Sequence, residues 1–445
     1  MLHKNRLLEE FFAPLLREDT DKLEQLRASI VLKKNTRYFD WTASGLASIL
    51  IEQRVKKLLP YYANAHSEAS THASLMCAVY ERSKEVVKKS LGLGEDFALL
   101  ATGFGATAAI KKFQEIMGIY IPPKTKQLFL QTKTLKSLPK VFVGPYEHHS
   151  NEISFREGLC AVQRIPLNAE GLLDIQEFER CLQSHRGAYA SFSVASNVTG
   201  VLSPCEKLSA LCRQYGAILA LDMASSSAYM NINASLFDAC FLSSHKLLGG
   251  VGGSGLLGIR KDLIDTSLPP SFSGGGVVKY VNRKTQEYIQ DIQTREEAGT
   301  LGLLQMYRSA LAYMLRDAYS LNAIRRREHI LTQTLLHELA SIPALRVYGN
   351  LSAERLGIVS FNVGGVSPYD LAYSLSQTHA IQTRAGCSCA GPYGHDLLEM
   401  KDLNSQALKS KPGWLRVSLH YTHSLEDIEY LVDCLKQSIK RLRGA

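Results

Sequence analysis

Between residues 95 and 260 the chain alternates short apolar runs with stretches of helical periodicity, and this alternation restricts the fold more than any other feature. The runs are FALLAT (97–102), KVFVGP (140–145), AVQRIPL (161–167), AYASFSVAS (188–196), AILALDM (217–223), ACFLSS (239–244) and SGLLGIR (254–260). Strands that are apolar along their length and separated by helices are typical of a mostly parallel sheet covered on both faces. The sequence therefore predicts an α/β domain.

A smaller α+β domain is predicted after this region. A long helical stretch begins near residue 301, short strand-like runs follow, and residues 424–442 form a last amphipathic segment. The first 19 residues mix acidic side chains into an apolar pattern, which indicates an amphipathic helix rather than a secretion signal. We place an N-terminal helical arm at 1–37, a large domain at 38–300 and a small domain at 301–445.

Charge and composition narrow the class of protein. The 51 Lys and Arg against 42 Asp and Glu give a net charge of +9, but the basic clusters are short and have acidic neighbours, as on solvated helix faces. We therefore expect no nucleic-acid partner. No apolar run approaches the roughly 20 residues of a membrane span, so we also expect no membrane partner. Nine cysteines without a repeating spacing favour a reducing, cytoplasmic location.

Polar residues follow several of the apolar runs, where parallel strands would end. They are His148 in EHHSN, Asn197 in SNVTG, Asp222 in LDM and Lys246 beside His245 in SSHKLLGG. Each alone is more often an ordinary loop residue, and a lysine there often extends to solvent. Because ligands bind at the carboxyl ends of such strands, the set together suits pyridoxal phosphate, which needs a lysine, an acid, an anion site and a flat contact.

From YFDWTASG at residue 38 almost to its end, the chain resembles class V aminotransferases, a family of fold type I pyridoxal-phosphate enzymes. The resemblance implies a large domain with a mostly parallel seven-stranded sheet. It also implies that Lys246 forms the Schiff base and that Asp222 pairs with the pyridine nitrogen. Ala224 and His148 would lie against the two faces of the ring, and His148 would be catalytic as well. Asn197 would lie near the ring hydroxyl and the substrate.

The same resemblance assigns the phosphate group and a partner. The implied phosphate contacts are Gly105, Ala106, Thr107, Ser243 and His245. Thr300, in REEAGT, corresponds to a threonine that reaches the phosphate bound by the partner subunit, so a homodimer is implied.

Two motifs in the carboxyl-terminal third indicate which reaction the chain catalyses. Arg416 resembles the family's clamp for the substrate carboxylate, and RAGCSCAGP resembles the R-x-G-x-x-C-A-x-P loop of group II cysteine desulfurases and selenocysteine lyases. Cys389 falls on the nucleophile of that loop, and Arg384 lies near enough to bind substrate and favour a thiolate. The resemblance implies removal of sulfur from L-cysteine, or selenium from selenocysteine, giving alanine and a persulfide on Cys389. A sulfur-acceptor protein is a further expected partner.

Some residues depart from the family pattern. Cys387 and Ser388 stand where the desulfurases usually have two histidines, Ser225 replaces a common glutamine, and Ala108 replaces a common acid. Cys387 is open to three interpretations: a thiol that accepts sulfur from Cys389, a partner in a reversible disulfide, or a small buried residue.

Two alternatives compete with desulfuration. The first is a class V aminotransferase, lyase or epimerase for another amino acid, in which Cys389 is incidental. The second is a metal-binding or scaffold protein with Cys387, Cys389 and His395 as ligands. A C-x-C pair with a histidine six residues on is not the usual zinc spacing, so we expect no metal.

Overall fold

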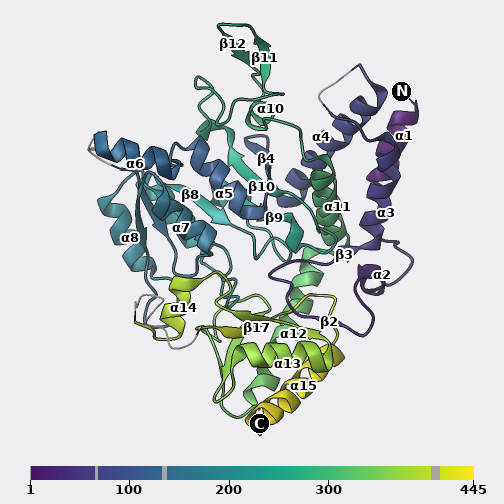
Figure 1. Cartoon of the computed structure of the whole chain (residues 1–445), viewed down its shortest axis with the longest axis vertical. Helices are drawn as coiled ribbons and strands as arrows, with labels where there is room; N and C mark the ends of the chain where they lie inside the picture. Colours follow the sequence, from purple (N-terminus) through teal and green to yellow (C-terminus); the bar gives the residue numbers. More distant parts are fainter. Residues whose placement is uncertain (1, 66–68, 133–137, 402–410, 445) are drawn as a thin grey trace.

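A seven-stranded sheet forms the centre of the computed structural model, which describes residues 2–65, 69–132, 138–401 and 411–444 (Figure 1). Its strands are β4 (Phe97–Gly103), β5 (Lys140–Val143), β6 (Ala161–Arg164), β7 (Tyr189–Ser193), β8 (Ile218–Asp222), β9 (Ala239–Ser243) and β10 (Gly255–Arg260). The order is β4-β10-β9-β8-β7-β5-β6, and β10 is antiparallel to both neighbours while the others share one direction. Each predicted apolar run is one of these strands, which confirms the mostly parallel sheet.

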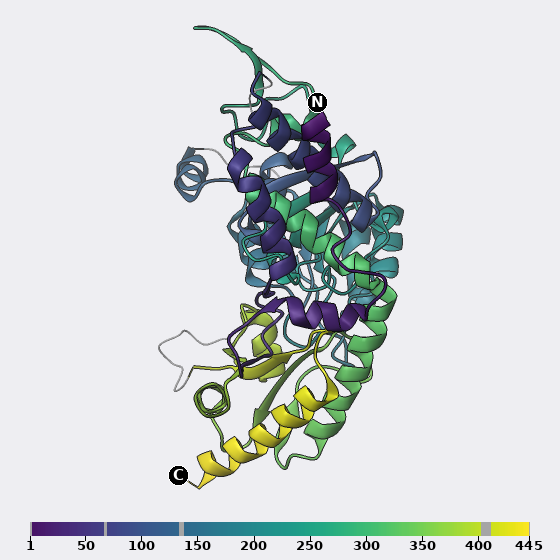
Figure 2. The ribbon, with the colours of Figure 1, turned by 90° about the vertical axis from the view of Figure 1, so that its right-hand side faces the viewer.

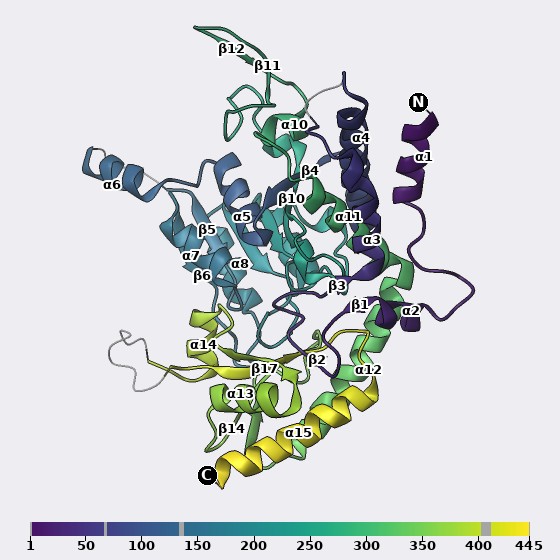
Figure 3. The same ribbon diagram turned by 45° about the vertical axis from the view of Figure 1, so that its right-hand side comes forward.

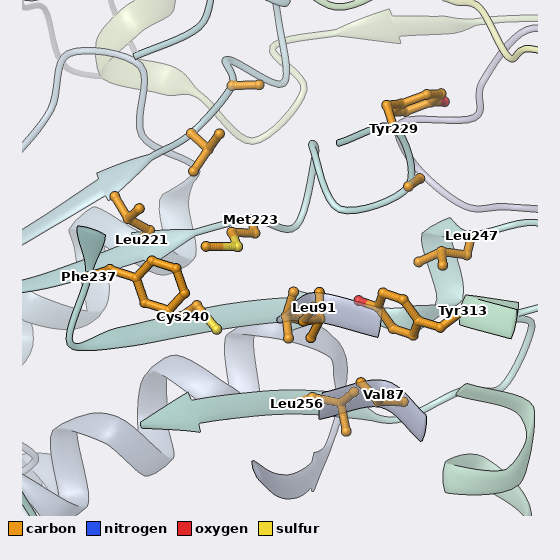
Figure 4. Close-up of a cluster of buried hydrophobic side chains, with 14 of the residues drawn as sticks. Val87, Leu91, Leu221, Met223, Tyr229, Phe237, Cys240, Leu247, Leu256 and Tyr313 are labelled. Atoms are coloured by element: carbon orange, nitrogen blue, oxygen red, sulfur yellow. The ribbon is translucent and has the colours of Figure 1, made fainter. Parts of the chain in front are cut away.

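Helices cover both faces of this sheet. They are α4 (Thr71–Leu91), α8 (Ile175–Ser184), α9 (Cys205–Tyr215) and α11 (Leu303–Tyr319) on one face, and α5 (Gly105–Ile116) and α7 (His149–Glu157) on the other. Because alternate residues of a strand point to opposite faces, Leu99 and Leu100 belong to different hydrophobic clusters. Figure 4 shows part of the first cluster, which includes Val87, Leu256 and Tyr313.

A second, four-stranded antiparallel sheet forms the small domain. Its order is β13 (Leu345–Val347), β14 (Ile358–Val363), β17 (Trp414–Ser418) and β16 (Arg384–Gly386). The helices of this domain are α12 (Leu321–Ala340), α13 (Pro368–His379), α14 (Gly391–Leu397) and α15 (Leu425–Arg443). Ser424 and Asp427 cap the start of α15 reciprocally, since each main-chain N–H donates to the other's side chain. The predicted last amphipathic segment is therefore this helix.

The amino-terminal segment crosses both domains. Its elements are α1 (Leu2–Phe11), α2 (Lys22–Ser29), β1 (Ile30–Val31), β2 (Arg37–Tyr38), β3 (Ala47–Ser48) and α3 (Ile49–Leu58). Strand β2 pairs in parallel with β15 (Ile381–Gln382) of the small domain, and Phe39 is buried in the small domain's core. Figure 3 shows β2 beside the small domain and α1 and α3 beside the large one. Residues just after β2 are thereby held between the two domains.

The long predicted helical stretch is two helices, because Ser320 has a φ of 78° and separates α11 from α12. The buried side chains of α11 belong to the cluster of the large sheet, whereas Leu331, Leu335 and Leu339 of α12 belong to the core of the small domain. The predicted boundary at residue 301 stays a prediction. On this packing we propose that the small domain begins after α11.

The remaining elements connect these layers. They are η1 (Leu59–Tyr61), α6 (Pro123–Thr132), η2 (Ala234–Leu236), η3 (Ser244–Lys246), η4 (Lys261–Leu263), β11 (Val278–Val281), β12 (Gln286–Tyr288) and α10 (Ile292–Glu296). The hairpin of β11 and β12 projects from the body (Figure 2). Within the part of the chain that the structure describes, no helix has the length and apolar character needed to cross a bilayer.

Candidate active site

A cavity lies at the carboxyl ends of β7, β8 and β9, between the large domain and the sheet of the small domain. It brings together all but one of the site residues predicted from the sequence. Those that line it are Gly105, Ala106, Thr107, His148, Asn197, Asp222, Ala224, Ser243, His245, Lys246, Arg384, Cys389 and Arg416. The exception is Thr300, which is exposed and lies outside the cavity. Its predicted contact with a partner subunit stays a prediction.

The cavity holds a buried amine and a buried carboxyl group. Lys246 ends the short helix η3 after β9, and burial lowers the pKa of its amine to about 8, although the charge of Asp222 acts in the opposite direction. Asp222 is the last residue of β8 and accepts a hydrogen bond from the Ala224 main-chain N–H at 2.9 Å. Burial raises the pKa of Asp222, and this N–H and Lys246 oppose the rise. A lysine of this kind supplies a neutral, nucleophilic amine at a pH where exposed lysines are charged.

The start of α5 borders the cavity on another side. Gly105 has a φ of 61°, and a side chain there would place Cβ 2.9 Å from Cε1 of His245, so only glycine fits. The Ala106 N–H donates to the Ser243 hydroxyl at 2.9 Å, and the Thr107 hydroxyl lies 2.7 Å from that of Ser150. Main-chain N–H groups, hydroxyls and the positive end of the helix dipole together form a site suited to an anion such as phosphate.

His148 presents a neutral ring to the cavity. It is the N-cap of α7, and its Nδ1 accepts the Ser150 N–H at 3.1 Å. Burial lowers the pKa of His148 to about 3, with a further lowering by the charge of Lys246. The ring is therefore uncharged at neutral pH and can lie flat against an aromatic ligand without adding a buried charge.

Two arginines from adjacent strands converge on one carboxylate. Arg384 of β16 and Arg416 of β17 are direct cross-strand neighbours. Arg416 is only 2% exposed; it donates to Asp40 Oδ1 at 2.7 Å and to the Asn197 carbonyl at 3.0 Å. Arg384 Nη1 lies 3.8 Å from Asp40 Oδ2. Because a buried guanidinium needs a charged partner, Asp40 holds the arginine in place. The sequence reasoning missed Asp40, although it lies in YFDWTASG, the stretch where the family resemblance begins.

Cys389 lies on a tight turn that leads from β16 to α14. The Ala390 N–H donates to the Cys387 carbonyl at 3.0 Å, which closes the turn, and the Cys389 carbonyl accepts the His149 N–H at 2.8 Å. Cys389 lines the cavity, whereas Cys387 packs against the large hydrophobic cluster. Cys387 is only partly buried, so its three interpretations stay open. Both cysteines are free thiols, and among the described residues no three His, Cys, Asp or Glu side chains are grouped to hold a metal ion.

The sequence pattern of the family described as aminotransferase class-V matches residues 37–431. The chain belongs to this family. The match begins at β2 and ends within α15, so it includes both domains and the cavity between them.

Two known proteins similar to this chain carry the same name. A "probable cysteine desulfurase" of Pyrococcus abyssi is 28% identical over 431 residues, which cover 95% of this chain and 99% of the relative. A protein of the same name from Staphylococcus aureus (strain COL) is 25% identical and covers 91% of this chain and 92% of the relative. The chain is thus similar to these proteins over nearly their whole length.

Solved structures agree as well. The apo structure of a cysteine desulfurase from Thermococcus onnurineus NA1 has a TM-score of 0.79 at 25% identity and covers 94% of this chain and 98% of that one. A cysteine desulfurase from Escherichia coli has a TM-score of 0.75 at 20% identity, again over 94% and 98%, and shows the fold alone. The fold predicted from the sequence, a class V fold of type I, is confirmed.

Of the residues that depart from the family pattern, some line the cavity and one does not. Ser225 and Ser388 line the cavity, so both can contact what binds there. Ala108 lies on α5 one residue after Thr107 and does not line the cavity. Sequence reasoning also missed the cavity-lining residues Thr42 and Ser193, which sit in runs without a distinctive motif.

Proposed function

We propose that the chain is a pyridoxal-phosphate-dependent cysteine desulfurase, which removes sulfur from L-cysteine, or selenium from selenocysteine, to give alanine and a persulfide on Cys389. The observation that carries the proposal is that the Cys389 thiol, the Lys246 amine and the Arg416 guanidinium line one cavity. The names of the similar proteins from Pyrococcus abyssi and Thermococcus onnurineus support it.

The residues of the cavity fit the cofactor. Lys246 would hold it through its amine. Asp222 would meet the pyridine nitrogen, since its buried carboxyl group accepts a hydrogen bond from the Ala224 N–H and from no other described residue. His148 and Ala224 would lie against the ring. Phosphate would lie at the groups around the start of α5, which are Gly105, Ala106, Thr107, Ser243 and His245. When bound, pyridoxal phosphate supplies an electron sink for bonds at the α and β carbons of an amino acid.

Arg416 and Asn197 would bind the substrate. Asp40 and the Asn197 carbonyl hold the guanidinium of Arg416, and a carboxylate suits its fork with two parallel hydrogen bonds. Among the described residues, the buried Nε of Arg416 and the buried Oδ1 of Asn197 have no hydrogen-bond partner. Buried polar groups are rarely left unpaired, so a ligand with a carboxylate and an ammonium group would satisfy both. Arg384, half-exposed beside them, would guide the same carboxylate into the cavity.

Cys389 would take the sulfur. Its thiolate attacks the sulfur of the bound cysteine, so an S–S bond forms while the bond from that sulfur to Cβ breaks. The electron pair of the broken bond goes to Cβ, which takes up a proton and becomes the methyl group of alanine. Lys246 is suited to carry protons, since the pKa of its amine is about 8.

The proposed partners follow from the same site. We propose a homodimer, in which Thr300 of each subunit reaches the phosphate site of the other. Phe104, at the mouth of the cavity, is 91% exposed, and a second subunit would cover so large an apolar side chain. A sulfur-acceptor protein would remove the persulfide sulfur, and the expected location is the cytoplasm.

The function is tested by incubating the cofactor-loaded protein with L-cysteine, L-selenocysteine and other L-amino acids, with dithiothreitol present to release persulfide sulfur as sulfide. We expect alanine and sulfide in equal amounts from L-cysteine and no keto acid. Keto acids from another amino acid, without sulfide from cysteine, would contradict desulfuration and favour an aminotransferase; another amino-acid product would favour a lyase or an epimerase.

The lowered pKa of Lys246 predicts how cofactor loading depends on pH. Only the neutral amine reacts, so the rate at which pyridoxal phosphate loads onto cofactor-free protein should rise with pH, with a midpoint near pH 8. The charge of Asp222 raises the pKa of Lys246 and that of Arg384 lowers it. Asp222→Asn should therefore move the midpoint to lower pH, and Arg384→Gln to higher pH. Stopped-flow absorbance measures the rates, and a midpoint near pH 10 in the unmodified protein would contradict the assignment.

A further inference from the structure

The turn that carries Cys389 has an unfavourable backbone. Ser388 and Cys389 are consecutive residues with φ of 53° and 56°, and they occupy the two central positions of the turn that the Ala390 N–H closes onto the Cys387 carbonyl. The left-handed region is disfavoured for residues that carry a Cβ. Such a backbone persists only where surrounding contacts hold it, and it is frequent at functional sites.

The hydroxyl and the carbonyl of Ser388 each accept a hydrogen bond. The indole N–H of Trp414 donates to the Ser388 hydroxyl at 3.2 Å, and Asn197 Nδ2 donates to the Ser388 carbonyl at 2.6 Å. Trp414 is fully buried and Ser388 nearly so. Hydrogen bonds shielded from water in this way constrain geometry strongly, because a broken bond leaves a buried group unpaired.

These anchors also support the arginine of the cavity. Trp414 lies two residues before Arg416 on β17, and Arg416 Nη1 donates to the carbonyl of the same Asn197 that holds Ser388. One strand and one asparagine therefore fix both the Cys389 turn and the guanidinium. The distance between thiol and carboxylate site is thereby set by rigid elements.

A second support acts on the other side of the turn. The His149 N–H donates to the Cys389 carbonyl at 2.8 Å, and the Gly391 N–H donates to His149 Nε2 at 2.8 Å. Both bonds use the main chain of the turn. The Cys389 side chain is left among the groups that line the cavity.

We propose that Ser388, anchored by Trp414, is a positioning residue that holds the Cys389 thiol in the cavity. Its role in catalysis rests on the proposed desulfuration, because the thiol must face the substrate sulfur when the S–S bond forms. A turn that relaxed to a right-handed backbone would carry the thiol away from that position, and small displacements of a reacting group slow a reaction strongly. The indole N–H of Trp414 supplies the donor that the Ser388 hydroxyl accepts.

The test uses cofactor-loaded protein and the variants Trp414→Phe, Ser388→Ala and their combination. Amide hydrogen exchange reports opening of the turn at Ala390 and Gly391, and alanine formation from L-cysteine reports catalysis. Each single variant should raise exchange and lower kcat by about 3- to 10-fold, the range of one buried hydrogen bond, with KM and cofactor absorption changed less than about 2-fold. The double variant should be no worse than the more affected single one, because both remove the same bond.

Two further variants distinguish the effect of the Trp414–Ser388 hydrogen bond from other effects. One tests the backbone conformation of the turn, and the other tests the loss of a buried indole N–H elsewhere. Ser388→Gly loses the hydroxyl but adopts positive φ readily, so its exchange and kcat should lie between those of Ser388→Ala and the unmodified protein. Trp41→Phe removes the other buried indole N–H, which donates to the Tyr38 carbonyl at 3.0 Å. It should leave exchange at Ala390 and Gly391 within about 2-fold of the unmodified protein, since it does not touch the turn.

Additive losses in the double variant, or unchanged exchange in both single variants, would overturn the proposal. A raised KM with unchanged kcat would also overturn it, since Ser388 would then act on substrate binding. If the unmodified protein forms no alanine from L-cysteine, the proposed desulfuration is wrong; the exchange measurements still decide whether Trp414 and Ser388 hold the turn.

Discussion

Lys246→Ala is expected to abolish the activity, with alanine formation from L-cysteine falling by at least about 1,000-fold, because both covalent attachment of the cofactor and proton transfer at the substrate depend on this amine. Burial lowers the pKa of the Lys246 amine to about 8, so a larger fraction of it is neutral near neutral pH than of an exposed lysine. Lys246→Arg should lose activity equally, since a guanidinium stays protonated and cannot replace a neutral amine.

Lys246→Ala is checked by the visible absorbance of the bound cofactor and by locating the lysine to which the cofactor is attached. After borohydride treatment, mass spectrometry of a digest should find the reduced cofactor on the peptide that contains Lys246 in the unmodified protein, and on none in Lys246→Ala. Lys207→Ala is the matched control, because Lys207 is exposed on α9 and outside the cavity. Cofactor label on another lysine of the unmodified protein would disprove the role of Lys246.

Cys389→Ala is expected to retain the cofactor but to lose desulfuration, with sulfide and alanine from L-cysteine reduced by at least about 100-fold. Among the described residues that line the cavity, no other offers a thiol to the substrate sulfur. Cofactor absorption should be unchanged, since the groups that would hold the ring and the phosphate come from the large domain. A persulfide should be found by mass spectrometry on Cys389 of the unmodified protein after one turnover without reductant.

Cys387→Ser provides the comparison for this variant. Cys387 packs against the hydrophobic cluster and does not line the cavity, so its replacement should leave sulfide release within about 2-fold. Equal losses in both variants would indicate that Cys387 accepts sulfur from Cys389. Unchanged alanine production in Cys389→Ala would contradict the proposed reaction and would leave an aminotransferase, lyase or epimerase.

The seven strands of the large sheet could be predicted because their signal is local. A strand buried on both faces must be apolar along its length, and a run such as AILALDM satisfies that condition without reference to the rest of the chain. The direction of each strand, by contrast, cannot be predicted from the residues of that strand alone. Nothing in SGLLGIR distinguishes β10, which runs against its neighbours, from the parallel strands.

Most of the candidate site could be predicted for a related reason. In a parallel sheet, residues that directly follow strands meet at one edge, so Asp222, Lys246 and Asn197 could be grouped from their positions alone. The position of α11 could not be predicted, since its apolar pattern suits burial against either sheet. Only the packing of α11 against α4, together with the left-handed Ser320, places it with the large domain.

The sequence by itself determined the strands, the family and the residue types at the ends of the strands. The tertiary structure decided which of them act together. Asp40 holds Arg416 across 376 positions of the chain, and Trp414 holds Ser388 across 26. No local pattern contains such pairs, because they arise when strands and domains pack together and bury groups that must then find partners. The same burial lowers the pKa of Lys246, so the chemistry expected of its amine depends on the folded protein.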